Sequence, residues 1–267
     1  MVVRSAHADG EMPGTAGTAP KIAVIDLWKS FAGNEVLRGI NLQVAPGESF
    51  VIVGGSGAGK TVLLKHLIGL IAPDRGHVII DGEDLTNTEP ARCLAIRRKF
   101  GMSFQEGALF DSMNVFENVA FPLRRHTRLS EQDIAARVRE CLDLVHLEGV
   151  EVKPTNELSG GMRRRVGFAR AIALQPEILL FDEPNTGLDP ITGAVIDSVI
   201  IEMREHLRVT MVTITHDMKS AFRIADRVAM LRSGQIVAVA APDVFRSLSD
   251  PYIQKFLAGE PLEEDVA

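Results

Sequence analysis

Short apolar runs alternate along this chain with longer stretches in which apolar residues recur every three or four positions. The longer stretches predict amphipathic helices at residues 62–70, 89–99, 162–174, 191–206 and 218–225. The short runs predict strands at residues 21–28, 36–44, 49–53, 77–80, 100–104, 178–181, 209–214, 228–231 and 235–239. Strands that alternate with helices favour an α/β fold with a mainly parallel sheet, and we expect the first two strands to be antiparallel.

Residues 114–146 interrupt this alternation, because they show helical periodicity and no strand signal. Ile134, Val138, Leu142 and Val145 form one stripe in this stretch, and we expect all four to be buried. Ser130 precedes the stripe in a pattern close to a helix capping box. We therefore predict that residues of about 106–160 form a helical subdomain inserted into the α/β core.

The two ends of the chain differ from the region between them. Residues 1–20 are rich in Gly, Ala and Thr and lack an apolar stretch, which predicts a disordered leader and not a secretory signal. Residues 21–245 form the predicted α/β domain. Residues 246–267 contain a helical stripe of Tyr252, Ile253, Phe256 and Leu257, followed by an acidic tail. The stripe packs on the chain's own core, which we favour, or docks on a second subunit.

Composition limits the kinds of partner that this chain can have. Among its 267 residues, 29 Lys and Arg stand against 35 Asp and Glu, and the net charge of −6 argues against a general nucleic-acid binder. Cys93 and Cys141 are the only cysteines, and we expect free buried thiols in a reducing compartment. No apolar run approaches the length needed to cross a bilayer. We expect a cytoplasmic protein that contacts a membrane only through a partner.

Residues 54–61 read GGSGAGKT and fit the phosphate-binding P-loop pattern G-x-x-x-x-G-K-[ST], between a predicted strand and a predicted helix. The glycines let backbone N–H groups point inward as an anion-binding nest, and the helix start adds positive potential. Lys60 is suited to the β- and γ-phosphates, and the hydroxyl of Thr61 to Mg²⁺. A glycine-rich turn with an unrelated Lys is the alternative, which the flanking elements disfavour. The predicted nucleotide contacts are Gly54, Gly55, Ser56, Gly57, Ala58, Gly59, Lys60, Thr61 and Val62.

The predicted strand at residues 178–181 ends in two acids, Asp182 and Glu183. Ligands of open α/β sheets lie at the carboxyl ends of strands, so both carboxylates are placed at a binding site. Asp182 is positioned to hold Mg²⁺, and Glu183 to polarise the attacking water as general base. The alternative is a strand that ends in two solvated acids, and the P-loop in the same chain disfavours it.

A second glycine turn, Ser159-Gly160-Gly161, directly precedes a predicted helix and forms a second anion site. One chain has one γ-phosphate to hold, so the second turn is explained if it serves a neighbouring copy. Two chains would then enclose two nucleotides head to tail. The alternative is an ordinary helix start that Ser159 caps.

Two further polar residues follow predicted strands. His216 comes after the strand at residues 209–214, where it is placed to contact the γ-phosphate. Gln105 comes after the strand at residues 100–104, where it is placed to bind Mg²⁺ or the water and to report the γ-phosphate to the inserted helices. A structural role is the alternative for both residues.

These motifs, in this order, resemble the nucleotide-binding subunit of ATP-binding cassette (ABC) transporters over residues of about 21–240. The resemblance implies an ABC ATPase domain at residues 21–245 that hydrolyses ATP with Mg²⁺, works as a homodimer and drives an integral-membrane permease. It also implies that Phe31 stacks on adenine, unless it is only an apolar residue at a strand end, and that Asp189 couples the two sites of the dimer. Met162 departs from the family, because many members carry Gln there. The motifs that carry the resemblance are GGSGAGKT, Gln105, LSGGM, LLFDEP, Gly187-Leu188-Asp189 and His216.

Residues 104–123 and 183–192 narrow the resemblance to the ATPases of Mla-type lipid transport systems, which are relatives of the Mce systems. In that family two copies drive a pair of permeases, with a membrane-anchored Mce-domain lipid-binding protein and often a small STAS-domain protein. The segment after Gln105 receives the coupling helix of the permease. The resemblance implies phospholipid movement between membranes of the cell envelope, driven from the cytoplasmic face of the inner membrane.

Three other functions share parts of this pattern. An ABC importer ATPase for another solute, such as an amino acid, would carry the same catalytic motifs and differ only after Gln105. A soluble ABC-type ATPase that acts on nucleic acid or ribosomes usually carries two cassettes or a long coiled coil, and the sequence shows one cassette and no sustained heptads. A nucleotide-binding regulator without hydrolysis is disfavoured by the intact Glu183 and His216.

Overall fold

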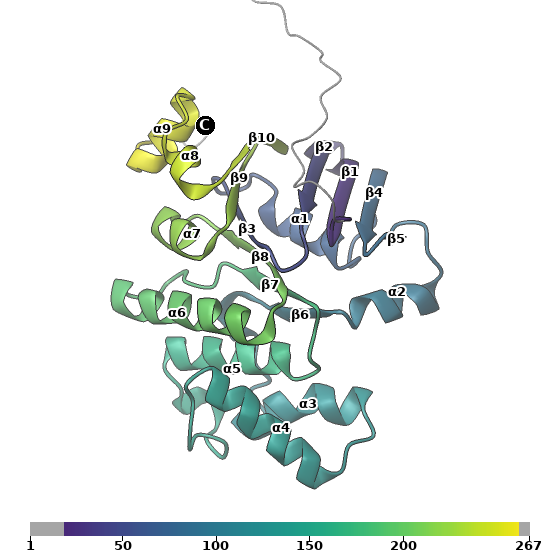
Figure 1. The fold of residues 1–267 in the computed structure, drawn as a ribbon, viewed down its shortest axis with the longest axis vertical. Helices are drawn as coiled ribbons and strands as arrows, with labels where there is room; N and C mark the ends of the chain where they lie inside the picture. The colour runs from purple at the N-terminus through teal and green to yellow at the C-terminus, as the bar shows by residue number, and fades with distance from the viewer. Residues whose placement is uncertain (1–18, 262–267) are drawn as a thin grey trace, which may run out of the picture.

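The computed structural model describes residues 19–261, which form two sheets and nine α-helices. The predicted leader, apart from its last two residues, and residues 262–267 of the predicted tail lie outside the described residues. Figure 1 shows the larger sheet in the middle of the molecule, with the smaller sheet on one side and helices on the other. The α/β fold predicted from the hydrophobic pattern is confirmed.

The smaller sheet is antiparallel and has the strand order β2-β1-β4-β5. The larger sheet has the order β10-β9-β3-β8-β7-β6, and only its edge strand β10 runs antiparallel to its neighbour. The strands are β1 (Ile22–Phe31), β2 (Asn34–Val44), β3 (Ser49–Val53), β4 (Arg75–Ile80), β5 (Glu83–Asp84), β6 (Phe100–Ser103), β7 (Ile178–Asp182), β8 (Thr210–Thr215), β9 (Arg227–Arg232) and β10 (Gln235–Ala240).

Alternate residues of the larger sheet face two separate hydrophobic cores, as the period of a strand requires. Phe50 and Ile52 face the core that β3 shares with the antiparallel sheet and with α1 (Lys60–Leu67). Val51 and Val53 face the core on the other side of the sheet. That side is covered by α6 (Pro190–Leu207) and α7 (Met218–Ile224), as Figure 1 shows. The central strands are therefore buried on both faces.

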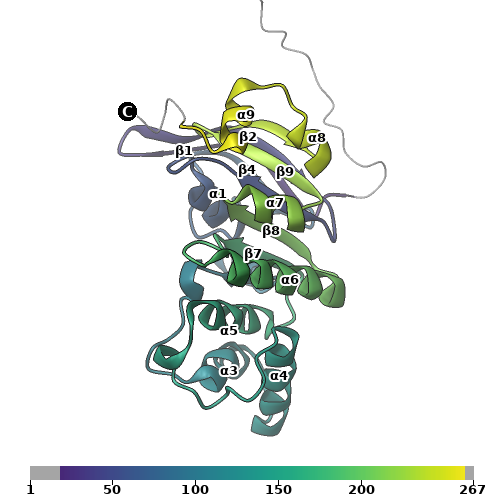
Figure 2. The same ribbon diagram turned by 90° about the vertical axis from the view of Figure 1, so that its left-hand side faces the viewer.

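Three helices, α3 (Val115–His126), α4 (Glu131–Leu144) and α5 (Gly160–Ile172), lie at the end of the molecule opposite the antiparallel sheet in Figures 1 and 2. The predicted stripe on α4 is buried as expected, because Ile134, Val138, Leu142 and Val145 are each at most 2% exposed. The short helices η1 (Gln105–Gly107) and η2 (Thr155–Glu157) stand on either side of α3 and α4 along the chain. The limits of the predicted subdomain, 106 and 160, stay a prediction.

The start of α4 has an incomplete capping box, as the sequence of Ser130 to Asp133 indicates. Ser130 caps α4 and accepts a hydrogen bond from the backbone N–H of Asp133, but the reciprocal bond of a capping box is not made by this pair. The full capping box stands at the start of α3, between Asn114 and Glu117. Asn114 and Glu117 have the required spacing of three residues.

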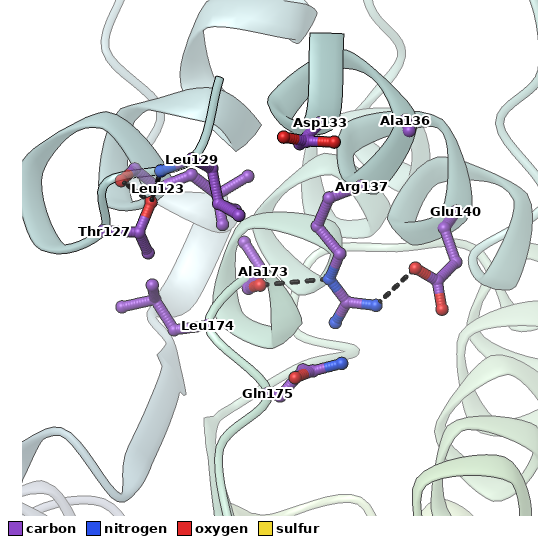
Figure 3. A pocket seen from close by; sticks show the side chains of 10 residues that line it. All are labelled: Leu123, Thr127, Leu129, Asp133, Ala136, Arg137, Glu140, Ala173, Leu174 and Gln175. Carbon is purple, nitrogen blue, oxygen red and sulfur yellow. Dashed lines mark hydrogen bonds and ion pairs between the residues drawn. The ribbon is translucent and has the colours of Figure 1, made fainter. Parts of the chain in front are cut away.

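Arg137 joins α4 to the end of α5 in a pocket where α3, α4 and α5 meet (Figure 3). Its guanidinium group donates to the backbone oxygens of Ala173 and Ile172, at 3.1 and 2.7 Å, and forms an ion pair of 2.8 Å with Glu140. The last carbonyl groups of a helix have no partner within the helix, so Arg137 caps α5. This contact ties α4 to the helix that begins at the second glycine turn.

The remaining helices are α2 (Pro90–Arg97), α8 (Pro242–Arg246) and α9 (Pro251–Ala258). Tyr252 and Ile253 on α9 are buried, and Phe256 and Leu257 pack beside them on the chain's own core, which agrees with the interpretation that we favour. The short elements β5 and α8 were not predicted.

The two cysteines differ in burial. Cys141 is buried, and burial raises the pKa of its thiol to about 12. The expectation of a buried thiol is wrong for Cys93, which is half-buried because it lies on the surface helix α2.

Candidate nucleotide-binding and catalytic site

Four neighbouring parallel strands of the larger sheet end at one edge, and predicted site residues follow each of them. β3 leads into the P-loop (residues 54–61), and β8 leads into His216. β7 ends at Asp182 and is followed by Glu183, and β6 leads into Gln105. Ligands of open α/β sheets bind at this edge. The structure therefore brings predicted groups from four segments of the chain to one place.

The P-loop lies close to β9 and leads directly into α1. A Cβ atom added to Gly54 would lie 2.2 Å from the backbone oxygen of Leu231, so only glycine fits at this position. Gly59 is the N-cap of α1, whose first residue is Lys60. Backbone N–H groups of the first helical turn are free to bind an anion. Ser56 at the tip of the loop is exposed, so a ligand can approach it.

The ammonium group of Lys60 folds back onto the P-loop. Its Nζ donates to the backbone oxygens of Gly54 and Gly55, at 2.8 and 3.0 Å, and lies 3.7 Å from Oε1 of Glu183. Burial lowers the pKa of Lys60, and the negative charge of Glu183 opposes that shift. A phosphate group in the loop would give this ammonium group a charged partner in place of neutral carbonyl groups.

Asp182 and Thr61 form the candidate magnesium site. Asp182 is 8% exposed, and its Oδ1 lies 3.5 Å from the hydroxyl oxygen of Thr61. Burial raises the pKa of Asp182, and the charge of Glu183 raises it further. A divalent cation would offset both effects, and oxygen ligands are the kind that Mg²⁺ prefers. The two residues therefore fit a magnesium ion, which they would hold through their oxygen atoms.

Glu183 and His216 contact each other beside these groups. Nδ1 of His216 lies 2.8 Å from Oε2 of Glu183, and the hydroxyl of Thr186 donates to the same oxygen at 3.0 Å. The backbone of Glu183 has a φ of 50°, in the left-handed region that residues other than glycine rarely adopt. Such strained residues persist where the surrounding structure holds them, and they concentrate at functional sites.

The second glycine turn, which we call the signature turn (residues 159–161), opens α5 away from the groups just described. Ser159 is exposed and caps α5 by accepting a hydrogen bond of 3.2 Å from the backbone N–H of Met162. A Cβ atom added to Gly161 would lie 2.6 Å from Cγ2 of Thr192. The cap occupies a lone pair of the Ser159 hydroxyl, so its O–H group can still donate to a ligand. The side chain of Met162 packs against the core.

The other predicted site residues differ in their surroundings. Phe31 ends β1, and its ring is 44% exposed, with Nζ of Lys29 5.4 Å from the ring centre. Gln105 is exposed, and within residues 19–261 it makes no hydrogen bond to Thr61 or Asp182. Val62 is half-buried in α1.

Asp189 is exposed, and it also caps a helix of its own chain. Its carboxylate caps α6 by accepting from the backbone N–H groups of Ile191 and Thr192, each at 3.0 Å. The hydroxyl of Thr192 donates to it as well, at 2.6 Å, and these bonds lower the pKa of Asp189. Asp189 therefore fixes the start of α6, whatever it contacts in a dimer.

Sequence reasoning missed the residues that hold the site segments in place. Asn118 on α3 is fully buried and bonds both the backbone N–H and the backbone oxygen of Phe110. Arg170 on α5 donates to the backbone oxygens of Gly107 and Ala108, at 2.8 and 2.9 Å. A polar residue on the apolar face of a helix was the available signal for Asn118. Arg164 donates to the backbone oxygen of Thr186, a contact between distant segments that leaves no sequence pattern.

The fold and the site together define an ATPase of the P-loop class. A family model described as "ABC transporter" matches residues 37–186, and the chain belongs to this family. ABC ATPases bind nucleotide and work as dimers with a membrane permease as partner. Among residues 19–261, no helix is both long enough and apolar enough to span a membrane.

Individual relatives cover most of the chain. It is 41% identical over 251 residues to the "Probable ribonucleotide transport ATP-binding protein mkl" of Mycobacterium leprae (strain TN), spanning 94% of this chain and 71% of that protein. It is 42% identical over 224 residues to the "Intermembrane phospholipid transport system ATP-binding protein MlaF" of Escherichia coli (strain K12), spanning 84% of this chain and 83% of MlaF. The "Dimeric Structure of MJ0796, a Bacterial ABC Transporter Cassette" matches with a TM-score of 0.76 and 32% identity, over 83% of this chain and 98% of that one.

Proposed function

We propose that this chain is the ATPase of a transporter that moves phospholipid between membranes of the cell envelope. The observation that carries this proposal is the 42% identity to MlaF, which extends over 83% of that protein. The mkl protein bears a different substrate in its name. Residues 104–123 and 183–192 favour the lipid, because the sequence of both segments resembles Mla-type ATPases.

The residues at the sheet edge suit hydrolysis of the γ-phosphate bond. In our proposal the P-loop and Lys60 bind the phosphates, while Thr61, Asp182 and Gln105 hold Mg²⁺. The bound ion would offset negative charge on the phosphates during transfer. Glu183 accepts a proton from the attacking water, and His216, 2.8 Å from Glu183, contacts the γ-phosphate. Phe31 offers its exposed ring to the adenine.

The signature turn completes the site of a second copy in this proposal. Ser159, Gly160 and Gly161 present a helix start and a hydroxyl group to the γ-phosphate bound by the partner. Asp189, which caps α6, would couple the two sites, as the resemblance to ABC ATPases implies. Two copies would therefore bind two nucleotides at their interface.

The coupling segment (residues 109–114) is the proposed contact with the permease. Asn118 fixes its backbone from inside the protein, and Arg170 lies 5.4 Å from the centre of the Phe110 ring. The ring centres of Phe110 and Phe121 lie 4.9 Å apart, and both residues are at least 40% exposed. A groove lined by Ser112, Met113, Glu117, Phe121, Arg124 and Arg125 lies beside them. A rigid backbone with exposed aromatic rings suits docking of a helix.

The location and the remaining partners follow from the same proposal. The ATPase would lie on the cytoplasmic face of the inner membrane, attached through the permease. An Mce-domain lipid-binding protein, and a STAS-domain protein on the ATPase, would complete the assembly.

The test is purification of the tagged chain with its membrane partners, followed by lipid analysis and ATPase assays in lipid nanodiscs. We expect a permease and phospholipid to co-purify, and phospholipid to stimulate ATP hydrolysis where ribonucleotides and amino acids do not. Phe110→Asp should release the permease and leave ATP binding unchanged, whereas Leu94→Asp, at an exposed position on α2, should release nothing. Stimulation by a soluble solute alone would contradict the lipid assignment.

A further inference from the structure

A buried polar cluster lies directly behind Glu183 and His216, at the junction of three segments. Asn185 belongs to the loop after Glu183, Asp197 to α6, and Ser220 to α7. The three side chains are 9%, 5% and 2% exposed. Burial of polar groups costs free energy unless they form hydrogen bonds, so the presence of three such groups together suggests a specific role.

The hydrogen bonds of this Asn185 cluster close a triangle. Nδ2 of Asn185 donates to Oδ1 of Asp197 at 2.7 Å and to Oγ of Ser220 at 2.9 Å. The hydroxyl of Ser220 donates to the same Oδ1 at 2.5 Å. Burial raises the pKa of Asp197, and the bonds from Ser220 and Asn185 oppose that shift. Oδ1 of Asn185 is buried and has no hydrogen-bond partner among the described residues. The amide is therefore held only by the two hydrogen bonds that its Nδ2 donates.

The cluster connects the two segments that carry the proposed catalytic groups. Ser220 lies in the first turn of α7, which begins two residues after His216 and is capped by Asp217. Asn185 lies two residues after Glu183, whose left-handed backbone needs support from its surroundings. The bond between Asn185 and Ser220 therefore fixes both segments behind the 2.8 Å contact of His216 with Glu183.

The same loop is also held from the opposite side. Arg164, one turn into α5, donates to the backbone oxygen of Thr186, and the hydroxyl of Thr186 donates to Glu183. Asp197, which accepts a hydrogen bond from Asn185, connects the loop to α6. The first turn of α6 is capped by Asp189. The loop from Glu183 to Asp189 is thus attached to α5, α6 and α7 at once.

We propose that Asn185 is a positioning residue for hydrolysis, which acts with Asp197 and Ser220 to set Glu183 against His216. The inference rests on the roles proposed above for Glu183 and His216. The cluster does not touch the P-loop, so its loss should lower kcat and leave the KM for ATP unchanged. A purely structural cluster would instead lower thermal stability and leave turnover per folded chain intact.

The experiment exchanges the two polar partners. Asn185→Asp places two carboxylates in contact and should lower kcat about 100-fold, and Asp197→Asn should lower it about tenfold, which corresponds to the loss of about 1.4 kcal/mol of transition-state stabilisation. The double variant Asn185→Asp with Asp197→Asn restores one donor and one acceptor, so kcat should return to within about threefold of the parent. Glu205→Gln, which exchanges a carboxylate for an amide at an exposed position of α6, is the matched control and should change kcat less than twofold.

Each measurement combines kcat and KM for ATP with the thermal midpoint, and Glu183→Gln is assayed alongside. Turnover that persists in Glu183→Gln overturns the proposed catalytic site itself. Loss of turnover in Glu183→Gln, with unchanged kcat in Asn185→Asp or no rescue in the double variant, overturns only the positioning role. Reduced kcat at constant KM, with rescue by the exchange, supports it.

Discussion

Two helices of this chain begin at glycine-rich turns, and the surroundings of the two turns differ. The P-loop opens α1 among reactive groups of its own chain, because Lys60 lies 3.7 Å from Glu183 and Thr61 lies 3.5 Å from Asp182. The signature turn opens α5 with an exposed serine, and the residues that pack behind it are Leu188 and Thr192. Both turns suit an anion, and only the P-loop has proposed catalytic groups within these distances.

This difference leads us to propose that two copies are needed for each active centre. In our proposal one chain provides the P-loop and the catalytic groups of one active centre, and the signature turn of the other. A second copy would then supply the missing groups to both centres. The predictions that follow test the two turns and the residues that support them, beginning with the largest expected effect.

Removal of the P-loop cation should have the largest effect. Lys60→Ala deletes the charge that our proposal assigns to the β- and γ-phosphates, and loss of one such stabilising group costs about 100-fold or more in turnover. Steady-state ATPase assays measure this loss. Lys219→Ala, which removes an exposed charge from α7, should leave the rate within about twofold. An active Lys60→Ala variant would contradict the assignment of the P-loop.

Neutralising the proposed base should separate binding from hydrolysis. Glu183→Gln keeps the shape of the side chain but cannot accept a proton, so turnover should fall about 100-fold or more while ATP binding is retained. The variant should accumulate as an ATP-bound dimer, which size-exclusion chromatography detects. A variant that hydrolyses ATP at the parent rate would show that another group is the base.

The signature turn can be tested without damage to the helix that it opens. Ser159→Asp keeps a good N-cap for α5 but places negative charge where we expect a γ-phosphate, so turnover should fall about tenfold or more at unchanged stability. Ala241→Asp places the same charge at the exposed N-cap of α8 and should leave turnover unaffected. If both variants keep full activity, Ser159 is only a helix cap.

The contact of Arg137 with the end of α5 should have the smallest effect. Arg137→Ala removes two hydrogen bonds to backbone oxygens and should lower the free energy of unfolding by about 1 to 2 kcal/mol, as urea titration measures. Arg139→Ala, on the exposed face of the same helix, should change it by less than about 0.5 kcal/mol. Equal effects of the two variants would mean that the cap contributes nothing to stability.

The sequence predicted those parts of the molecule that contiguous patterns encode. The P-loop occupies eight consecutive positions, and the buried strand before Asp182 has an unbroken apolar run. The predicted ends of helices and strands were less accurate. The helix predicted at 62–70 begins two residues earlier, because Lys60 and Thr61 belong to its first turn.

The supports of the site could not be predicted in the same way. Asn185, Asp197 and Ser220 come from three elements, and nothing local in the sequence indicates that their side chains meet. The strained backbone of Glu183 is equally invisible, since it depends on how neighbouring helices hold the loop. Motifs thus identify the reacting groups, and tertiary packing determines how they are aligned.

The most direct test measures ATPase activity per chain as the purified protein is diluted, with sedimentation velocity in ATP to report its association state. If each active centre needs groups from two copies, activity per chain should fall about tenfold for each tenfold dilution once monomers predominate. Activity per chain that stays constant in solutions containing only monomers would contradict the account.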